Sequence, residues 1–81
     1  MHLYVAFLGG ELAGNRMGED HEVVFVVAED TKTARKAAKK KWGGEGRVHV
    51  DALTRLDMID GFAVALAESG QGDVTDMSGY N

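Results

Sequence analysis

The stretch VVFVVAEDTKTARKAAKKKWGG, residues 23–44, decides the fold, because its apolar residues change from strand spacing to helix spacing. Val23–Ala28 is a run of β-branched and aromatic residues, which favours a strand that is buried on both faces. After Asp30 the apolar residues recur every three or four positions and lie on one arc of a helix. These are Ala34, Ala37, Ala38 and Trp42. The stretch therefore predicts a strand followed directly by a helix.

Local signals set the expected ends of this helix. The side chain of Asp30 or Thr31 can accept a hydrogen bond from a free amide of the first turn, and Gly43 or Gly44 supplies a left-handed stop. A helix of about 12 residues follows. The arc opposite the alanines is basic and consists of Lys32, Arg35, Lys36, Lys39 and Lys40. Lys41 falls on the apolar arc, and we expect its stem to run along that surface to water.

Three further segments have strand character. Leu3–Leu8 is apolar at almost every position, which predicts a strand buried on both faces. Arg47–Leu53 alternates, with Val48, Val50 and Ala52 on one side and His49, Asp51 and Leu53 on the other. Asp57–Gly61 has turn residues, and Phe62–Leu66 returns as a fourth strand. The expected order of elements is β-β-α-β-β.

This order predicts an α+β fold with a four-stranded, mostly antiparallel sheet and one helix on one face. A right-handed crossover through the helix makes the second and third strands parallel, so the first strand lies between them and the sheet order is 2-1-3-4. We expect a single α+β domain over residues 1–66. Residues 67–81 are rich in Gly, Ser and Asp and are expected to form a C-terminal tail.

The size of the chain predicts self-association. With 81 residues and no cysteine, a single core has little to stabilise it, and a second copy is the simplest remaining source of buried surface. A helix ~18 Å long and ~10 Å wide cannot cover a sheet roughly 20 Å square. Val23–Val27 would also be an apolar edge strand, which a monomer avoids. We therefore expect a homodimer that forms through the open sheet face or this edge.

The charge and hydropathy of the chain argue against a nucleic-acid-binding, membrane-spanning or secreted protein. Six of the nine Lys and Arg residues lie within residues 32–41 although the net charge is −4, so the helix is basic and the remainder is acidic. A basic helix could neutralise phosphates, but its exposed arc has no aromatic residue to stack on bases, and nucleic-acid binding is not expected. No apolar segment approaches ~18 residues and no signal-peptide pattern is present. The expected location is the cytoplasm, without membrane contact.

The combined pattern resembles a small bacterial family, domain of unknown function 1543 (DUF1543). The resemblance covers about three quarters of the chain, and the lysine-rich helix is more basic than the family pattern. The residues that carry it are Leu8, Gly9, Gly10, Gly14, His21, Glu22, Val23, Phe25, Val26, Val27, Lys40, Trp42, His49, Val50, Asp51, Asp60 and Gly61. The resemblance implies no established activity. Some members carry two copies of the unit, which agrees with the expected pairing.

The glycine-rich connection after the first strand is the first candidate binding segment. Gly9, Gly10 and Gly14 match neither the dinucleotide-binding nor the P-loop pattern, and no helix follows to offer free amides to a phosphate. A long connection whose glycines allow tight bends is the favoured interpretation. A ligand-binding loop stays open as the alternative, because connections longer than ~12 residues are often functional.

The second candidate is a group of two histidines and an aspartate. His21, His49 and Asp51 could supply imidazoles and a carboxylate to a ligand or a divalent metal. In the expected sheet order, however, the first strand separates their strands by ~10 Å, which side chains span only in part. Structural roles for both histidines are therefore favoured, and we expect no metal, no cofactor and no catalytic residue.

These observations rank three functions. The first is a small cytoplasmic, non-enzymatic module that binds a protein partner or a small ligand as a homodimer. The second is a small metal-dependent or acid/base enzyme with a site at a dimer cleft. The third is nucleic-acid binding through the lysine-rich helix. The sequence leaves open whether the chain is an enzyme.

Overall fold

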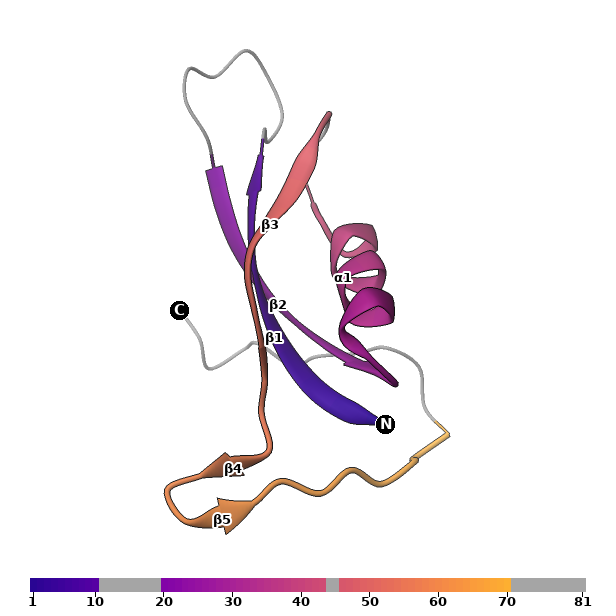
Figure 1. Cartoon of the computed structure of the whole chain (residues 1–81). Coiled ribbons are helices and arrows are strands. Elements are labelled where there is room, and N and C mark those ends of the chain that lie inside the picture. The colour runs from indigo at the N-terminus through magenta and orange to yellow at the C-terminus, as the bar shows by residue number, and fades with distance from the viewer. Residues whose placement is uncertain (11–19, 44–45, 71–81) are drawn as a thin grey trace.

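The computed structural model describes residues 1–10, 20–43 and 46–70, and shows an α+β protein (Figure 1). Three long strands form one sheet, one helix packs beside it, and a short hairpin follows. The described elements are β1 (His2–Gly10), β2 (Asp20–Ala28), α1 (Thr31–Lys40), β3 (Val48–Arg55), β4 (Met58–Ile59) and β5 (Phe62–Ala63).

The sheet has the order β2-β1-β3, and both pairs are antiparallel. β1 is the central strand, as its apolar composition predicts. Its pairing with β2 is regular from His2 opposite Ala28 to Gly10 opposite Asp20. The expected positions of the first three strands are thus confirmed, and β2 and β3 are the two edges.

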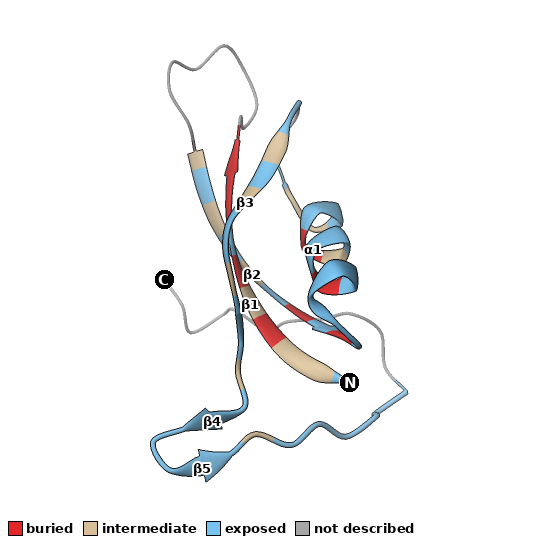
Figure 2. Cartoon of the chain, viewed as in Figure 1, coloured by how far each residue is buried: buried red, intermediate tan, exposed pale blue. Residues whose placement is uncertain are grey.

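The core lies between α1 and one face of the sheet, which we call the covered face (Figure 2). Its buried residues are Tyr4, Ala6, Leu8, Val26, Ala28, Ala34 and Ala38. The helix contributes only alanines to this set, so its backbone lies close to the strands. Trp42, just beyond the helix, packs against the cluster and adds the bulk that the alanines lack.

The helix begins as predicted and ends earlier than predicted. Asp30 is the N-cap, and its Oδ1 accepts a hydrogen bond from the backbone N–H of Thr33 at 2.8 Å. The helix has 10 residues, and its C-cap, Lys41, is right-handed with φ −86°. The expected left-handed stop at Gly43 is therefore wrong, and Gly44 lies outside the described residues.

Contacts with β2 fix the end of the helix instead. The Nζ atom of Lys41 donates a hydrogen bond to the carbonyl oxygen of Phe25 at 2.7 Å. The backbone N–H of Gly43 donates to Oε1 of Glu22 at 3.2 Å. Lys41 thus lies against an edge strand rather than extending to water, and tertiary contacts replace the glycine cap.

A bulge interrupts the pairing of β1 with β3. Leu8 pairs with Val50 and Phe7 pairs with Ala52, so Asp51 is an extra residue without a partner on β1. Beyond the bulge the alternation is reversed, because Leu53 packs against the core while Ala52 is exposed. The predicted regular alternation through Leu53 is therefore wrong.

The predicted fourth strand does not join the sheet. Phe62–Ala63 pairs with Met58–Ile59 in a separate two-stranded hairpin, which we call the arm (residues 58–63). The two turn residues, Asp60 and Gly61, have φ values of 54° and 85°. Two positive φ angles in a two-residue connection are the mark of a type I′ turn, which returns the chain directly onto the preceding strand.

The face of the sheet opposite α1 carries apolar residues that are not buried, and we call it the open face. Phe7, Val23, Phe25 and Val27 lie on it and are 44–49% exposed. The predicted burial of β1 and β2 on both faces is therefore wrong, since Phe7 of β1 is also exposed. No helix within the described residues is long and apolar enough to cross a bilayer.

We expect the N-cap of α1 to make folding stability depend on pH. The hydrogen bond from the Thr33 backbone N–H lowers the pKa of the Asp30 carboxyl below its ordinary value of 3.8. The stabilising effect of the charged cap is therefore fully present above the unfolded pKa and is lost as the pH falls through the lowered folded pKa. The urea midpoint should drop in Asp30→Ala at neutral pH, and the drop should shrink near pH ~2.

Asp30→Asn is the matched control, because asparagine caps helices without ionising. Its midpoint should stay close to that of the wild-type protein at neutral pH. An Asp30→Ala effect of equal size at both pH values would contradict the assignment of Asp30 as a charged cap.

Candidate functional site

Two histidines flank a glycine on the open face near one end of the sheet. Gly9 of β1 pairs with His21 of β2 on one side and with His49 of β3 on the other. Residues that are directly opposite in a sheet point to the same face, so both imidazoles lie on the open face. Gly9 has no side chain, which leaves free space between them.

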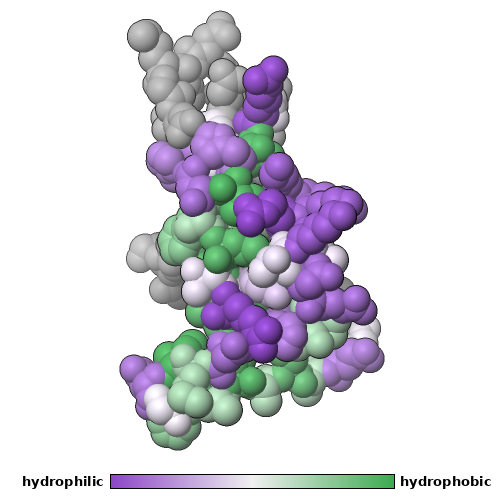
Figure 3. Space-filling view, viewed as in Figure 1, coloured by the Kyte–Doolittle hydropathy of each residue, from purple (hydrophilic) through white to green (hydrophobic). Residues whose placement is uncertain are grey.

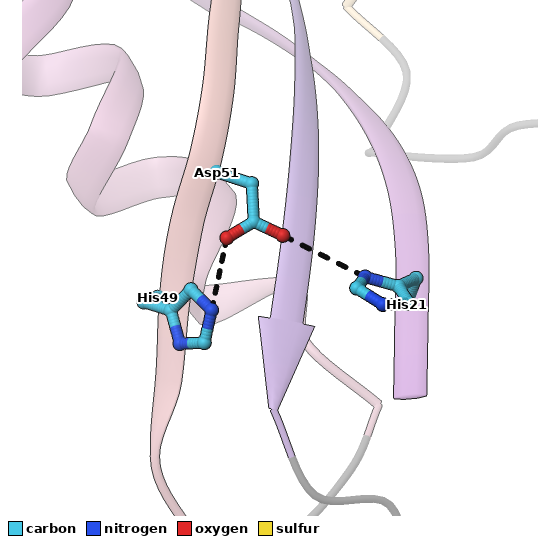
Figure 4. A network of polar contacts seen from close by, with 3 residues as sticks. All are labelled: His21, His49 and Asp51. Carbon is cyan, nitrogen blue, oxygen red and sulfur yellow. Dashed lines mark ion pairs between the residues drawn. The ribbon is translucent and has the colours of Figure 1, made fainter. Parts of the chain in front are cut away.

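Asp51 extends into this space (Figure 4). Its Oδ1 lies 2.9 Å from Nε2 of His49, and its Oδ2 lies 3.6 Å from Nδ1 of His21. The bulge leaves the Asp51 side chain free of a facing residue on β1, so the carboxylate reaches across the central strand. The ~10 Å between the outer strands, which made a shared site improbable from sequence, is spanned by this carboxylate.

The cluster of His21, Asp51 and His49 is polar and accessible. The three side chains are 65%, 40% and 50% exposed, so water still solvates each of them. Each contact is an ion pair when the imidazole carries a proton. A carboxylate and two imidazoles offer both hydrogen-bond donors and acceptors to a ligand. In the part of the chain that the structure describes, no three His, Cys, Asp or Glu side chains are arranged to hold a metal ion.

The candidate glycines have different surroundings. Gly10 is buried, and a Cβ placed on it would overlap the carbonyl oxygen of Arg47 and lie 3.2 Å from the ring of Trp42. This close packing gives Gly10 a structural role on the covered side. Gly9 makes room for the histidine and aspartate cluster, and Gly14 lies outside the described residues.

The basic arc of α1 faces away from the sheet, as predicted. Its five cationic residues are Lys32, Arg35, Lys36, Lys39 and Lys40, and all are exposed. Figure 3 shows the hydrophilic surface that gathers over the helix. No ion pair joins these five side chains to another described residue. The helix presents no aromatic side chain beside them, so the feature that would favour base stacking is missing from α1.

Sequence reasoning missed the apolar residues of the arm. Met58 is 68% exposed and Phe62 is 77% exposed, whereas the sequence predicts Met58 in a turn and Phe62 in a strand of the sheet. The Asp60–Gly61 dipeptide was the sequence signal for the arm, because Asp-Gly as a two-residue loop is the strongest short-range indication of a hairpin.

A comparison with protein families places the chain in a known family. The model of the family described as Domain of Unknown Function (DUF1543) matches residues 16–66, which is more than half of the chain. The chain belongs to this family. The DUF1543 match includes His21, His49, Asp51 and the whole arm, whereas Gly9, Gly10 and Gly14 precede it. No match was found among curated proteins or among solved structures.

The shared carboxylate should be detectable by NMR spectroscopy. In Asp51→Asn we expect the ring nitrogen signals of both His21 and His49 to move, because one carboxylate contacts both imidazoles. The control is Asp57→Asn, which removes an exposed carboxylate that contacts Arg55 and should leave both signals in place. A shift of only one histidine in Asp51→Asn would contradict the bridged arrangement.

Proposed function

We propose that this DUF1543 protein is a non-enzymatic binding module that works as a homodimer, with the open face as the dimer interface. The observation that supports it is the contrast between the two faces of one sheet. The covered face is sealed by α1, whereas Phe7, Val23, Phe25 and Val27 on the open face remain close to half exposed. A contiguous apolar surface of this kind marks an interaction site.

The β2 edge of the sheet is less suited to pairing than this face. β2 is an edge strand. The ammonium group of Lys41 donates a hydrogen bond to the carbonyl oxygen of Phe25, which lies in the middle of β2. Although Lys41 belongs to the end of α1, its ammonium group lies at this edge, and a charge at a strand edge hinders the addition of another strand. The open face, by contrast, carries the apolar side chains of Phe7, Val23, Phe25 and Val27, with its polar cluster near one end.

In this proposal His21, Asp51 and His49 form the recognition end of the open face. They bring donors and acceptors to the border of an apolar surface, which is the usual composition of a ligand site. A small polar ligand or a polar segment of a partner protein fits this chemistry. The setting we propose is the bacterial cytoplasm.

The proposal predicts a dimer that depends on the open face. Sedimentation equilibrium should show a dimer for the wild-type protein at micromolar concentration. Phe25→Glu should be a folded monomer, because Phe25 is 46% exposed within the chain and a carboxylate would be desolvated in the interface. Circular dichroism checks the fold. Lys36→Glu, on the exposed face of α1, is the control and should remain a dimer. A wild-type monomer would refute the proposal.

A second candidate function is a metal-dependent or acid/base enzyme that uses the same cluster. The convergence of two imidazoles on one carboxylate favours the acid/base form of this enzyme, since these groups transfer protons, although no three described side chains are arranged to hold a metal ion. The accessibility of all three side chains disfavours it, because catalytic groups are commonly desolvated to shift their pKa values.

Calorimetric titration of the untagged protein with Zn²⁺ separates the two candidates. A non-enzymatic module predicts no stoichiometric binding. Stoichiometric binding by the wild-type protein that is lost in Asp51→Asn would favour the metal-dependent enzyme instead. His2→Ala is the control, because His2 contacts the ring of Tyr4 rather than the cluster.

A further inference from the structure

The arm is separated from the rest of the fold. No Cα atom of β4 or β5 lies within 8 Å of a Cα atom of another described helix or strand. Figure 1 shows the hairpin projecting beyond the end of the sheet. Its apolar side chains have no core of their own, since Met58, Ile59 and Phe62 are 68%, 49% and 77% exposed. An isolated two-stranded hairpin is at best marginally stable in water, so the arm lacks a packing partner within the described chain.

The base of the arm is nevertheless held firmly. The backbone N–H of Leu56 donates to the carbonyl oxygen of Leu3 at 2.8 Å, which continues the sheet up to the bend. The Nε of Arg55 donates to Oδ1 of Asp57 at 2.7 Å, and the N–H of Val64 donates to the carbonyl oxygen of Asp57 at 2.9 Å. Together with the type I′ turn, these bonds fix the direction of the hairpin. A preformed element loses little conformational entropy on binding.

We propose that the arm docks on the open face of a second copy of the chain, so that the two subunits exchange arms. This inference rests on the proposed homodimer and specifies how it is built. Among the described residues, each chain carries an apolar arm that packs on no other helix or strand and an apolar sheet face that stays close to half exposed. Two-fold symmetry pairs each arm with the open face of the other subunit. The same contact therefore buries the apolar side chains of the arm and covers the open face.

The area available supports an exchange of arms over a simple stacking of sheets. A strand of nine residues is ~30 Å long and three strands are ~14 Å wide, so the open face offers about 400 Å². A stable interface buries about 800 Å² on each partner. The sheet face alone therefore supplies about half of the required area. Among the described residues, the arm adds the exposed apolar side chains of Met58, Ile59 and Phe62.

The open face also continues into a hollow. A depression of about 460 Å³ is lined by Met1, Val27, Leu66, Ala67 and Glu68. Val27 belongs to the open face, so the apolar surface does not end at the last residues of β2. Side chains of the docked arm have room to enter this hollow.

The first test removes the apolar side chains of the arm. In the double variant Met58→Ser/Phe62→Ser we expect the dimer dissociation constant to rise about tenfold or more in sedimentation equilibrium, because both side chains lose their burial in the partner. The fold should persist, since the Cα atoms of both residues lie more than 8 Å from every described helix or strand outside the arm. Ala65→Ser, at an exposed position just after the arm, is the matched control and should leave the dissociation constant unchanged.

The second test detects the contact itself. In a mixture of isotope-labelled and unlabelled protein, filtered NMR spectra should show contacts between the ring of Phe62 and side chains of Phe25 or Val27. Within one chain β5 is not near β2, so such contacts come only from the second copy. Absence of these contacts in a sample that is dimeric overturns the inference.

The outcomes separate this inference from the proposed function. If the double arm variant dimerises like the wild-type protein while Phe25→Glu is monomeric, arm exchange is wrong and the open-face dimer stands. If the wild-type protein is monomeric at micromolar concentration, both are wrong.

Discussion

The pairing of β1 with a strand on each side is the constraint on which the rest of the structure depends. β2 and β3 both pair with β1 in an antiparallel register, so residues opposite one another point to the same face of the sheet. One of these faces is buried and the other is exposed. Tyr4, Ala6 and Leu8 meet the helix, whereas Phe7 and its neighbours on β2 remain accessible. The same pairing places His21 and His49 on either side of Gly9. The core, the proposed interface and the polar cluster are therefore three results of a single strand alignment.

Much of this arrangement could be predicted from local sequence patterns. The change of period after Ala28, the cap at Asp30 and the central position of β1 are properties of short segments, and the structure confirms them. The errors arise where distant contacts decide the outcome. The helix ends where Lys41 and Gly43 meet β2, and no pattern within the helix contains that information. The predicted fourth strand does not join the sheet because the tight turn at Asp60–Gly61 pairs Phe62–Ala63 with Met58–Ile59 instead of with β3.

The candidate cluster was predictable in its members but not in its geometry. His21, His49 and Asp51 stood out as residue types, and the sheet order correctly placed β1 between their strands. A bulge leaves no periodic signature, so the extra residue at Asp51 could not be inferred from alternation. The absence of a side chain at Gly9 also matters only once its two neighbours across the sheet are known. For this reason a distance between strand axes was a poor guide to whether their side chains could meet.

The contact of Lys41 with the edge of β2 has a further consequence for how the protein behaves at high concentration. A sheet with an unobstructed edge can add strands without limit, which leads to fibres. Lys41 places a charge at the middle of the β2 edge. The exposed apolar surface lies instead on the open face, and each chain has one open face. Growth through a single self-complementary face stops at a pair. In the proposed two-fold dimer, the chain therefore uses its exposed apolar surface in a closed pair, while the charge of Lys41 hinders the addition of strands at the β2 edge.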